Sequence, residues 1–188
     1  LQLCDVRSVI LYLEARQDLD AGRLGIWAES MAPINLPRAI AEEHDSRLID
    51  NSLRPNLPHG PAIGEPAGPI LALLASLFEE NVKALVIRRG LVNWLSLFDS
   101  YFLYVPSDAV VPGSVNAGDL NDLAAAFAPR PLRIESPVDA RNCLVEAAEL
   151  PGRHEMITAA YSKQPGNFQL SATLRDDTSA WLARGLNT

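Results

Sequence analysis

The sequence has few of the residues that build disulfide frameworks and metal sites. Only two of its 188 residues are cysteine and three are histidine. Cys4 and Cys143 lie far apart in the chain, form no CxxC pair and have no histidine at metal-ligand spacing. We therefore expect two free thiols, no disulfide framework and no zinc site. No other metal and no cofactor is expected.

Positive charge and long apolar runs are also scarce. The formal net charge is -7 at pH 7 and the pI is near 4.9. Such a surface repels polyanions, so neither nucleic acid nor a membrane is expected as a partner, whereas a small molecule or another protein is. No apolar run reaches the roughly 18 residues of a membrane span. The N-terminus lacks the features of a signal peptide, and because residue 1 is Leu, we expect the polypeptide to begin upstream.

The remaining composition is that of a globular domain with a substantial core. Hydrophobic residues make up 48% of the chain and charged residues 21%. Segments with strand composition alternate with segments of helical spacing, which predicts an α/β fold with a mostly parallel sheet flanked by helices. The predicted strands are 23–28, 83–88, 131–135 and 168–173, and the predicted helices are about 5–13, 70–80, 120–127, 153–162 and 178–186.

One long segment breaks this alternation. Residues 32–69 hold half of the 14 prolines, which are poorly accommodated inside helices and strand ladders. We expect an irregular insertion within a single domain that covers residues 1–188. A segment of this length without regular structure is usually functional or mobile.

The first predicted strand leads into a serine at a position typical of a nucleophile. A strand, a sharp turn that carries serine and then a helix form a nucleophile elbow, in which the following backbone N–H group faces a developing oxyanion. The usual signature is G-x-S-x-G, and here the segment is Ala28-Glu29-Ser30-Met31-Ala32, with alanine at both glycine positions. Ser30 is therefore a candidate nucleophile and Met31 a candidate oxyanion donor, although an ordinary turn serine fits the pattern too.

A wider resemblance supports this interpretation. Residues 23–31, 71–90 and 128–139 run in the order seen in α/β-hydrolases and resemble the acetyl xylan esterase and dienelactone hydrolase branches. The resemblance implies that the chain is the C-terminal portion of such a domain, with the first strands missing. It also implies that Ser30 is the nucleophile and that Asp139 is the acid that orients the catalytic histidine. Asp139 could equally form a local turn.

The same resemblance places the catalytic histidine after the last strand, where the sequence reads Leu174-Arg175-Asp176-Asp177. No imidazole is present there, and a carboxylate is a poor base for a serine hydroxyl. Of the three histidines elsewhere, His59 is the best substitute, because the proline-rich insertion could fold back over Ser30. His154 is expected to be a solvated or capping side chain, and His44 to belong to a charged face.

Two functions remain open from the sequence. The first is a serine ester hydrolase of acetyl esterase type, which acts on a small-molecule ester through an acyl-enzyme with Ser30, Asp139 and His59 as catalytic residues. The second is a catalytically silent α/β-hydrolase-like module that serves assembly or ligand binding. In either case strand 23–28 would lie at an open sheet edge. We expect an upstream part of the same polypeptide, or a partner chain, to complete the sheet there.

Overall fold

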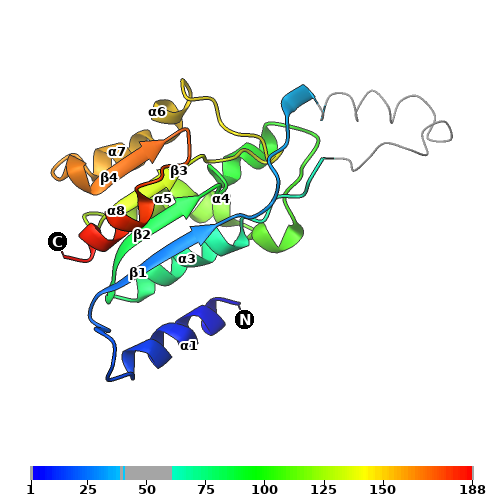
Figure 1. The fold of residues 1–188 in the computed structure, drawn as a ribbon. Helices are drawn as coiled ribbons and strands as arrows, with labels where there is room; N and C mark the ends of the chain where they lie inside the picture. Colours follow the sequence, from blue (N-terminus) through cyan, green and yellow to red (C-terminus); the bar gives the residue numbers. More distant parts are fainter. Residues whose placement is uncertain (1, 39, 41–60, 188) are drawn as a thin grey trace.

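A four-stranded parallel sheet forms the centre of the computed structural model, which describes residues 2–38, 40 and 61–187 (Figure 1). The strands are β1 (Leu24–Glu29), β2 (Val82–Arg88), β3 (Leu132–Glu135) and β4 (Phe168–Ser171), in the spatial order β1-β2-β3-β4. All three neighbouring pairs are parallel. The prediction of an α/β fold with a parallel sheet is therefore confirmed.

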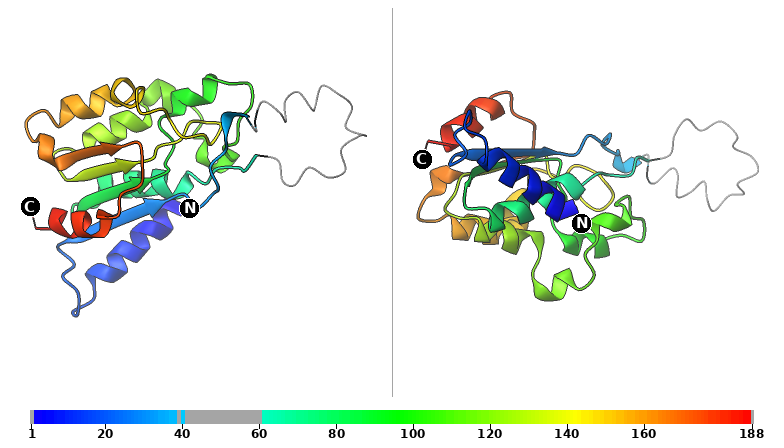
Figure 2. Two further views of the ribbon diagram at one scale, coloured as in Figure 1. Left: turned by 45° about the horizontal axis from the view of Figure 1, so that its top comes forward. Right: turned by 90° about the horizontal axis from the view of Figure 1, so that it is seen from below.

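Helices cover both faces of the sheet, as Figure 2 shows. One face packs against α1 (Gln2–Glu14), α3 (Ala67–Phe78), α5 (Leu120–Ala126) and α7 (Glu155–Ala160). The other face packs against α8 (Thr178–Gly185), which contacts β1 and β2. The connections contain α4 (Ser114–Ala117), α6 (Leu150–Arg153) and the 3-10 helices η2 (Trp94–Phe98), η3 (Ser107–Ala109) and η4 (Pro165–Asn167).

The main core lies between the sheet and the four helices on its first face. Strand positions alternate between the two faces, so alternate residues of a strand contribute to this core. In β2 a register shift near its start adds Val82 to Leu85 and Ile87. The helices contribute apolar residues spaced three or four positions apart. The buried members are Ile10, Ala28, Ala72, Leu73, Ala75, Val82, Leu85, Ile87, Ala124, Phe127, Leu132, Ile134, Ile157 and Tyr161.

Two predicted elements differ from the structure. The helix predicted over about 153–162 corresponds to the shorter α7, and the preceding α6 is separated from it at His154, whose backbone leaves helical geometry at φ -121° and ψ 20°. The last strand ends at Ser171 rather than at 173. There the Ser171 hydroxyl bonds both the C=O and the N–H of Thr173, which favours a turn over a continued strand.

A buried ion-pair network fastens α8 to its face of the sheet. The Glu135 side chain is fully buried and accepts hydrogen bonds from Arg88 Nε at 2.7 Å and Thr178 Oγ1 at 2.6 Å. Arg133 lies 3.3 Å from Glu135 and 2.9 Å from Asp177. The hydrogen bond from Arg133 holds the pKa of Asp177 below its usual value. The network therefore joins the ends of two strands to the start of α8.

β1 lies at an edge of the sheet. Among the described residues it pairs only with β2, so its other side has no neighbouring strand. Trp27, near the middle of β1, is 41% exposed and stacks against the Arg88 guanidinium. In the part of the chain that the structure describes, the predicted open edge is present.

Cys4 is exposed and Cys143 is buried, and both are free thiols, as predicted. None of the helices among the described residues has the length and apolar character needed to cross a membrane.

Candidate functional site

Ser30 follows β1 directly at the carboxyl end of the sheet. Its backbone N–H donates to Arg88 O at 3.2 Å, which continues the pairing with β2 by one residue. Its side chain is buried, with 2% of the residue exposed, and its Oγ accepts a hydrogen bond from Glu65 N at 3.3 Å. The segment that leads into α3 therefore covers the hydroxyl.

The backbone at Ser30 differs from the predicted elbow. An elbow requires a strained turn that leads at once into a helix. The described non-glycine residues with positive φ are Arg89, Ser136 and Asn142, and Ser30 is not among them. After β1 the chain continues without helix until residue 37. Ser30 thus ends a strand, as predicted, but does not stand at a strand–turn–helix junction.

Met31, the predicted oxyanion donor, has a side chain that projects into solvent and is 76% exposed. Its backbone N–H donates to no acceptor among the described residues. A group of this kind can stabilise a negative oxygen if a reacting carbonyl is placed beside it.

Asp139 lies beyond β3, also at the carboxyl end of the sheet, but its carboxylate is engaged within its own turn. Oδ1 accepts hydrogen bonds from Arg141 N at 2.9 Å and Cys143 N at 3.0 Å. Oδ2 accepts from Arg141 Nε at 2.8 Å and forms an ion pair with the same guanidinium. This is the turn-forming role that the sequence left open. Burial, together with the charge of Asp139, raises the pKa of the Cys143 thiol to about 11, so this cysteine is a poor nucleophile.

Two asparagines hold the loops around Ser30 together. Asn35 Nδ2 donates to Ala62 O and Arg141 O at 2.8 Å each, and its Oδ1 accepts from Ala62 N at 2.7 Å. Asn142 Nδ2 donates to Pro33 O at 2.8 Å. We call Asn35 and Asn142 the asparagine clamp. The clamp has no signal in the sequence, because its partners are backbone groups from distant loops and no local motif marks them.

The histidines do not complete a triad in the described part of the chain. His59 and His44 lie outside the described residues. His154 is buried, contrary to the expectation of a solvated or capping side chain, and its Nδ1 lies 2.9 Å from Leu150 O. Burial, followed by the charge of Arg153, lowers the pKa of His154. Among the described residues, none of the Ser30 hydrogen bonds involves an imidazole.

The loop after β4 has a structural role in the network around Glu135. Arg175 N donates to Glu135 at 3.1 Å, and Asp177 pairs with Arg133. The position that the resemblance assigns to the histidine is therefore occupied by groups that fasten α8.

Comparisons with protein-family models, with curated proteins and with solved structures found no match to this chain. Its function must therefore be argued from the fold and from the residues at the carboxyl end of the sheet.

Proposed function

We propose that this chain is a catalytically silent α/β-hydrolase-like module that serves assembly or ligand binding. One observation carries the proposal: Ser30 and Asp139 are held by partners other than an imidazole. The Ser30 hydroxyl is buried beneath Glu65 N, and the Asp139 carboxylate is engaged by Arg141 and its own turn.

A serine hydroxyl needs an adjacent base to become an effective nucleophile. The loss of a single triad member typically lowers the rate by about four to six orders of magnitude. In the described residues Ser30 keeps the weak nucleophilicity of an ordinary alcohol. The burial of the Ser30 hydroxyl and the hydrogen bonds of the Asp139 carboxylate to Arg141 thus both favour a module without turnover.

The fold supports the α/β-hydrolase part of the proposal. α3, α5 and α7 each connect two parallel strands and pack on one face of the sheet, while α8 packs on the other (Figure 1). The position of Ser30 after β1 and of Asp139 after β3 follows the order that the resemblance implies. Function, however, depends on the site and not on the fold.

The open edge of β1 supports the assembly role. Leu24 N and Ser30 N donate toward β2, so backbone groups of alternate residues face β2 and those of Gly25, Trp27 and Glu29 face outward. Unpaired strand groups of this kind accept an additional strand. We propose that an extended segment, from an upstream part of the polypeptide or from a partner chain, pairs there.

Amide hydrogen exchange combined with light scattering tests this assembly role. The Trp27 amide should be protected only when a strand is added, whereas the Ala28 amide, which faces β2, should be protected in every folded form. A stable monomer of residues 1–188 whose Trp27 amide exchanges freely would count against strand addition.

A serine ester hydrolase is the second candidate, and the Met31 N–H beside Ser30, which donates to none of the described residues, favours it. In this mechanism the Ser30 oxygen attacks the carbonyl of a small-molecule ester while an imidazole takes its proton, and Met31 N–H stabilises the oxyanion. The alcohol then leaves with that proton, and water releases the acid from the acyl-enzyme. His59 would supply the imidazole. The Asp139 carboxylate would have to release Arg141 and bind that imidazole instead.

Labelling with a fluorophosphonate probe and turnover of p-nitrophenyl acetate separate the two candidates. The silent module predicts no labelling above the level of Ser30→Ala and no turnover. Labelling that is lost in Ser30→Ala and in His59→Ala, but retained in His154→Ala, would establish the hydrolase instead. Hydrolysis that survives Ser30→Ala would refute the assignment of Ser30 as nucleophile.

A further inference from the structure

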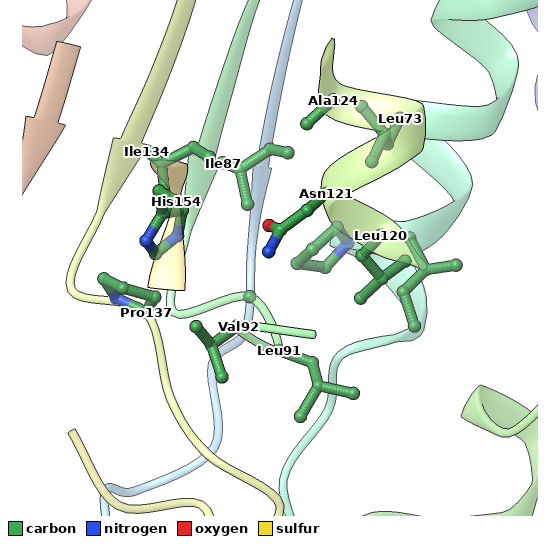
Figure 3. Close-up of a pocket in the computed structure, with 13 residues that line it drawn as sticks. Leu73, Ile87, Leu91, Val92, Leu120, Asn121, Ala124, Ile134, Pro137 and His154 are labelled. Carbon is green, nitrogen blue, oxygen red and sulfur yellow. The ribbon is translucent and has the colours of Figure 1, made fainter. Parts of the chain in front are cut away.

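A small cavity lies at the carboxyl ends of β2 and β3, between the sheet and helices α3 and α5 (Figure 3). Its volume is about 30 Å³. Most of its wall is apolar, and includes Leu73, Ile87, Leu91, Ala124 and Ile134. Ligands of open α/β folds bind beyond the carboxyl ends of parallel strands, which is where this cavity lies.

His154 places a hydrogen-bond acceptor in this apolar wall. Only 1% of the residue is exposed, and Nδ1 lies 2.9 Å from Leu150 O. Because a carbonyl oxygen only accepts, Nδ1 carries the hydrogen and Nε2 of the neutral ring has a free lone pair. Every fully enclosed side-chain nitrogen or oxygen among the described residues has a hydrogen-bond partner. His154 Nε2 has no partner among these residues, so it is not fully enclosed. Nε2 therefore borders space that a water-sized molecule can enter.

Asn121 supplies the other polar group of the cavity. It projects from α5, and Figure 3 shows its amide across the space from the His154 ring. Asn121 Nδ2 donates to Arg153 O at 2.6 Å. The second N–H and the Oδ1 have no partner among the described residues. Asn121 is half-buried, in contrast to the enclosed His154.

We propose that this cavity binds a small neutral compound that carries a hydroxyl group on a short apolar body. The hydroxyl donates to His154 Nε2, and its oxygen accepts from Asn121. A volume of about 30 Å³ corresponds to roughly two water-sized spheres, so the hydroxyl and one or two carbons are enclosed. A charged ligand is disfavoured because the apolar wall would strip its hydration without an opposite charge. This site is separate from Ser30 and does not depend on the proposed function.

The surroundings of His154 keep its acceptor available. Burial and the neighbouring Arg153 lower the pKa of the imidazole, so the ring is neutral at pH 7. The other side chains of the cavity wall, apart from Asn121, are apolar and supply no competing hydrogen bond. An alcohol that enters the cavity therefore meets the His154 acceptor, with the Asn121 amide as the other polar side chain of the wall.

Titration with 2-propanol and with acetone, followed by NMR of the His154 ring nitrogens, tests the proposal. The two compounds have the same skeleton, but acetone has no hydrogen to donate. We expect a saturable shift of Nε2 with 2-propanol and about three- to tenfold weaker binding of acetone, the ratio expected for one hydrogen bond. Equal binding of the two compounds, or a non-saturable shift, would overturn the proposal, as would a site that retains water only.

Two variants on α5 provide a matched control. Ala124→Val fills the cavity from its wall without touching the imidazole, and should abolish the saturable shift. Ala126→Val makes the same change at an exposed position of the same helix and should leave the shift unchanged. If 2-propanol binds Ala124→Val as tightly as it binds the unmodified protein, the ligand lies elsewhere and the proposal fails.

Discussion

Replacement of Glu135 tests whether the buried network holds α8 to the sheet. Glu135 is fully enclosed and contacts two guanidinium groups, Arg88 at 2.7 Å and Arg133 at 3.3 Å. Its oxygens also accept from Thr178 at 2.6 Å and from Arg175 N at 3.1 Å. In Glu135→Ala all of these donors lose their acceptor at once.

The magnitude follows from the burial of the partners. Loss of one member of a buried ion pair costs about 3–5 kcal/mol, because the other charge stays buried without a counterion. Arg133 keeps Asp177 at 2.9 Å, and Arg88 keeps Glu29 at 3.8 Å, so the lower end of this range applies. We expect a loss of about 3 kcal/mol in the free energy of unfolding, or about 6–12 °C in Tm for a domain of this size.

Urea denaturation followed by circular dichroism measures this loss. Glu149→Ala is the matched control, because Glu149 forms an exposed ion pair with Arg153 at 3.2 Å, a class of pair that contributes about 0.3–0.5 kcal/mol. Should Glu135→Ala cost less than about 1 kcal/mol, or no more than Glu149→Ala, the network would not fasten α8.

Two further predictions concern His154 and the asparagine clamp. Burial lowers the folded-state pKa of His154 below its ordinary value, so the unfolded chain takes up the proton first as the pH falls. The unfolding free energy should therefore fall between pH 7 and pH 5, and His154→Gln should reduce this slope; an unchanged slope would show that other groups cause it. Asn35→Ala removes its hydrogen bonds to Ala62 N, Ala62 O and Arg141 O, of which Ala62 O keeps a longer bond from Asn142 Nδ2 at 3.4 Å, and should cost about 1–3 kcal/mol in urea denaturation. If the cost is less than that of an exposed Asn→Ala substitution such as Asn187→Ala, the clamp does not stabilise the loops.

The sheet could be predicted from the sequence because its signals are local. The predicted strands 23–28, 83–88, 131–135 and 168–173 agree with β1 to β4 within one or two residues at each end. A run of β-branched residues and a helical spacing of apolar residues can each be recognised within a short window of the sequence. Their alternation then determined the parallel arrangement.

The site could not be predicted to the same degree, because its geometry depends on contacts between distant segments. The sequence places Ser30 at the end of a strand, but its burial depends on Glu65, and the role of Asp139 depends on Arg141. His154 follows Arg153 and precedes Glu155, a polar context that indicates a surface position. The break between α6 and α7 instead turns its ring inward, where Leu150 O accepts a hydrogen bond from Nδ1.

The asparagine clamp also bears on how the chain tolerates changes in the segment between its two anchor points. Asn35 bonds both backbone groups of Ala62, so two positions 27 residues apart in the sequence are joined. The entropy of closing a loop grows only with the logarithm of its length, at about 0.6 kcal/mol for each doubling. By this relation, a longer connection between Asn35 and Ala62 raises the entropic cost of bringing these two residues together only slightly. The hydrogen bonds of Asn35 therefore hold the two ends of the connection together at the carboxyl end of the sheet, whatever residues lie between them.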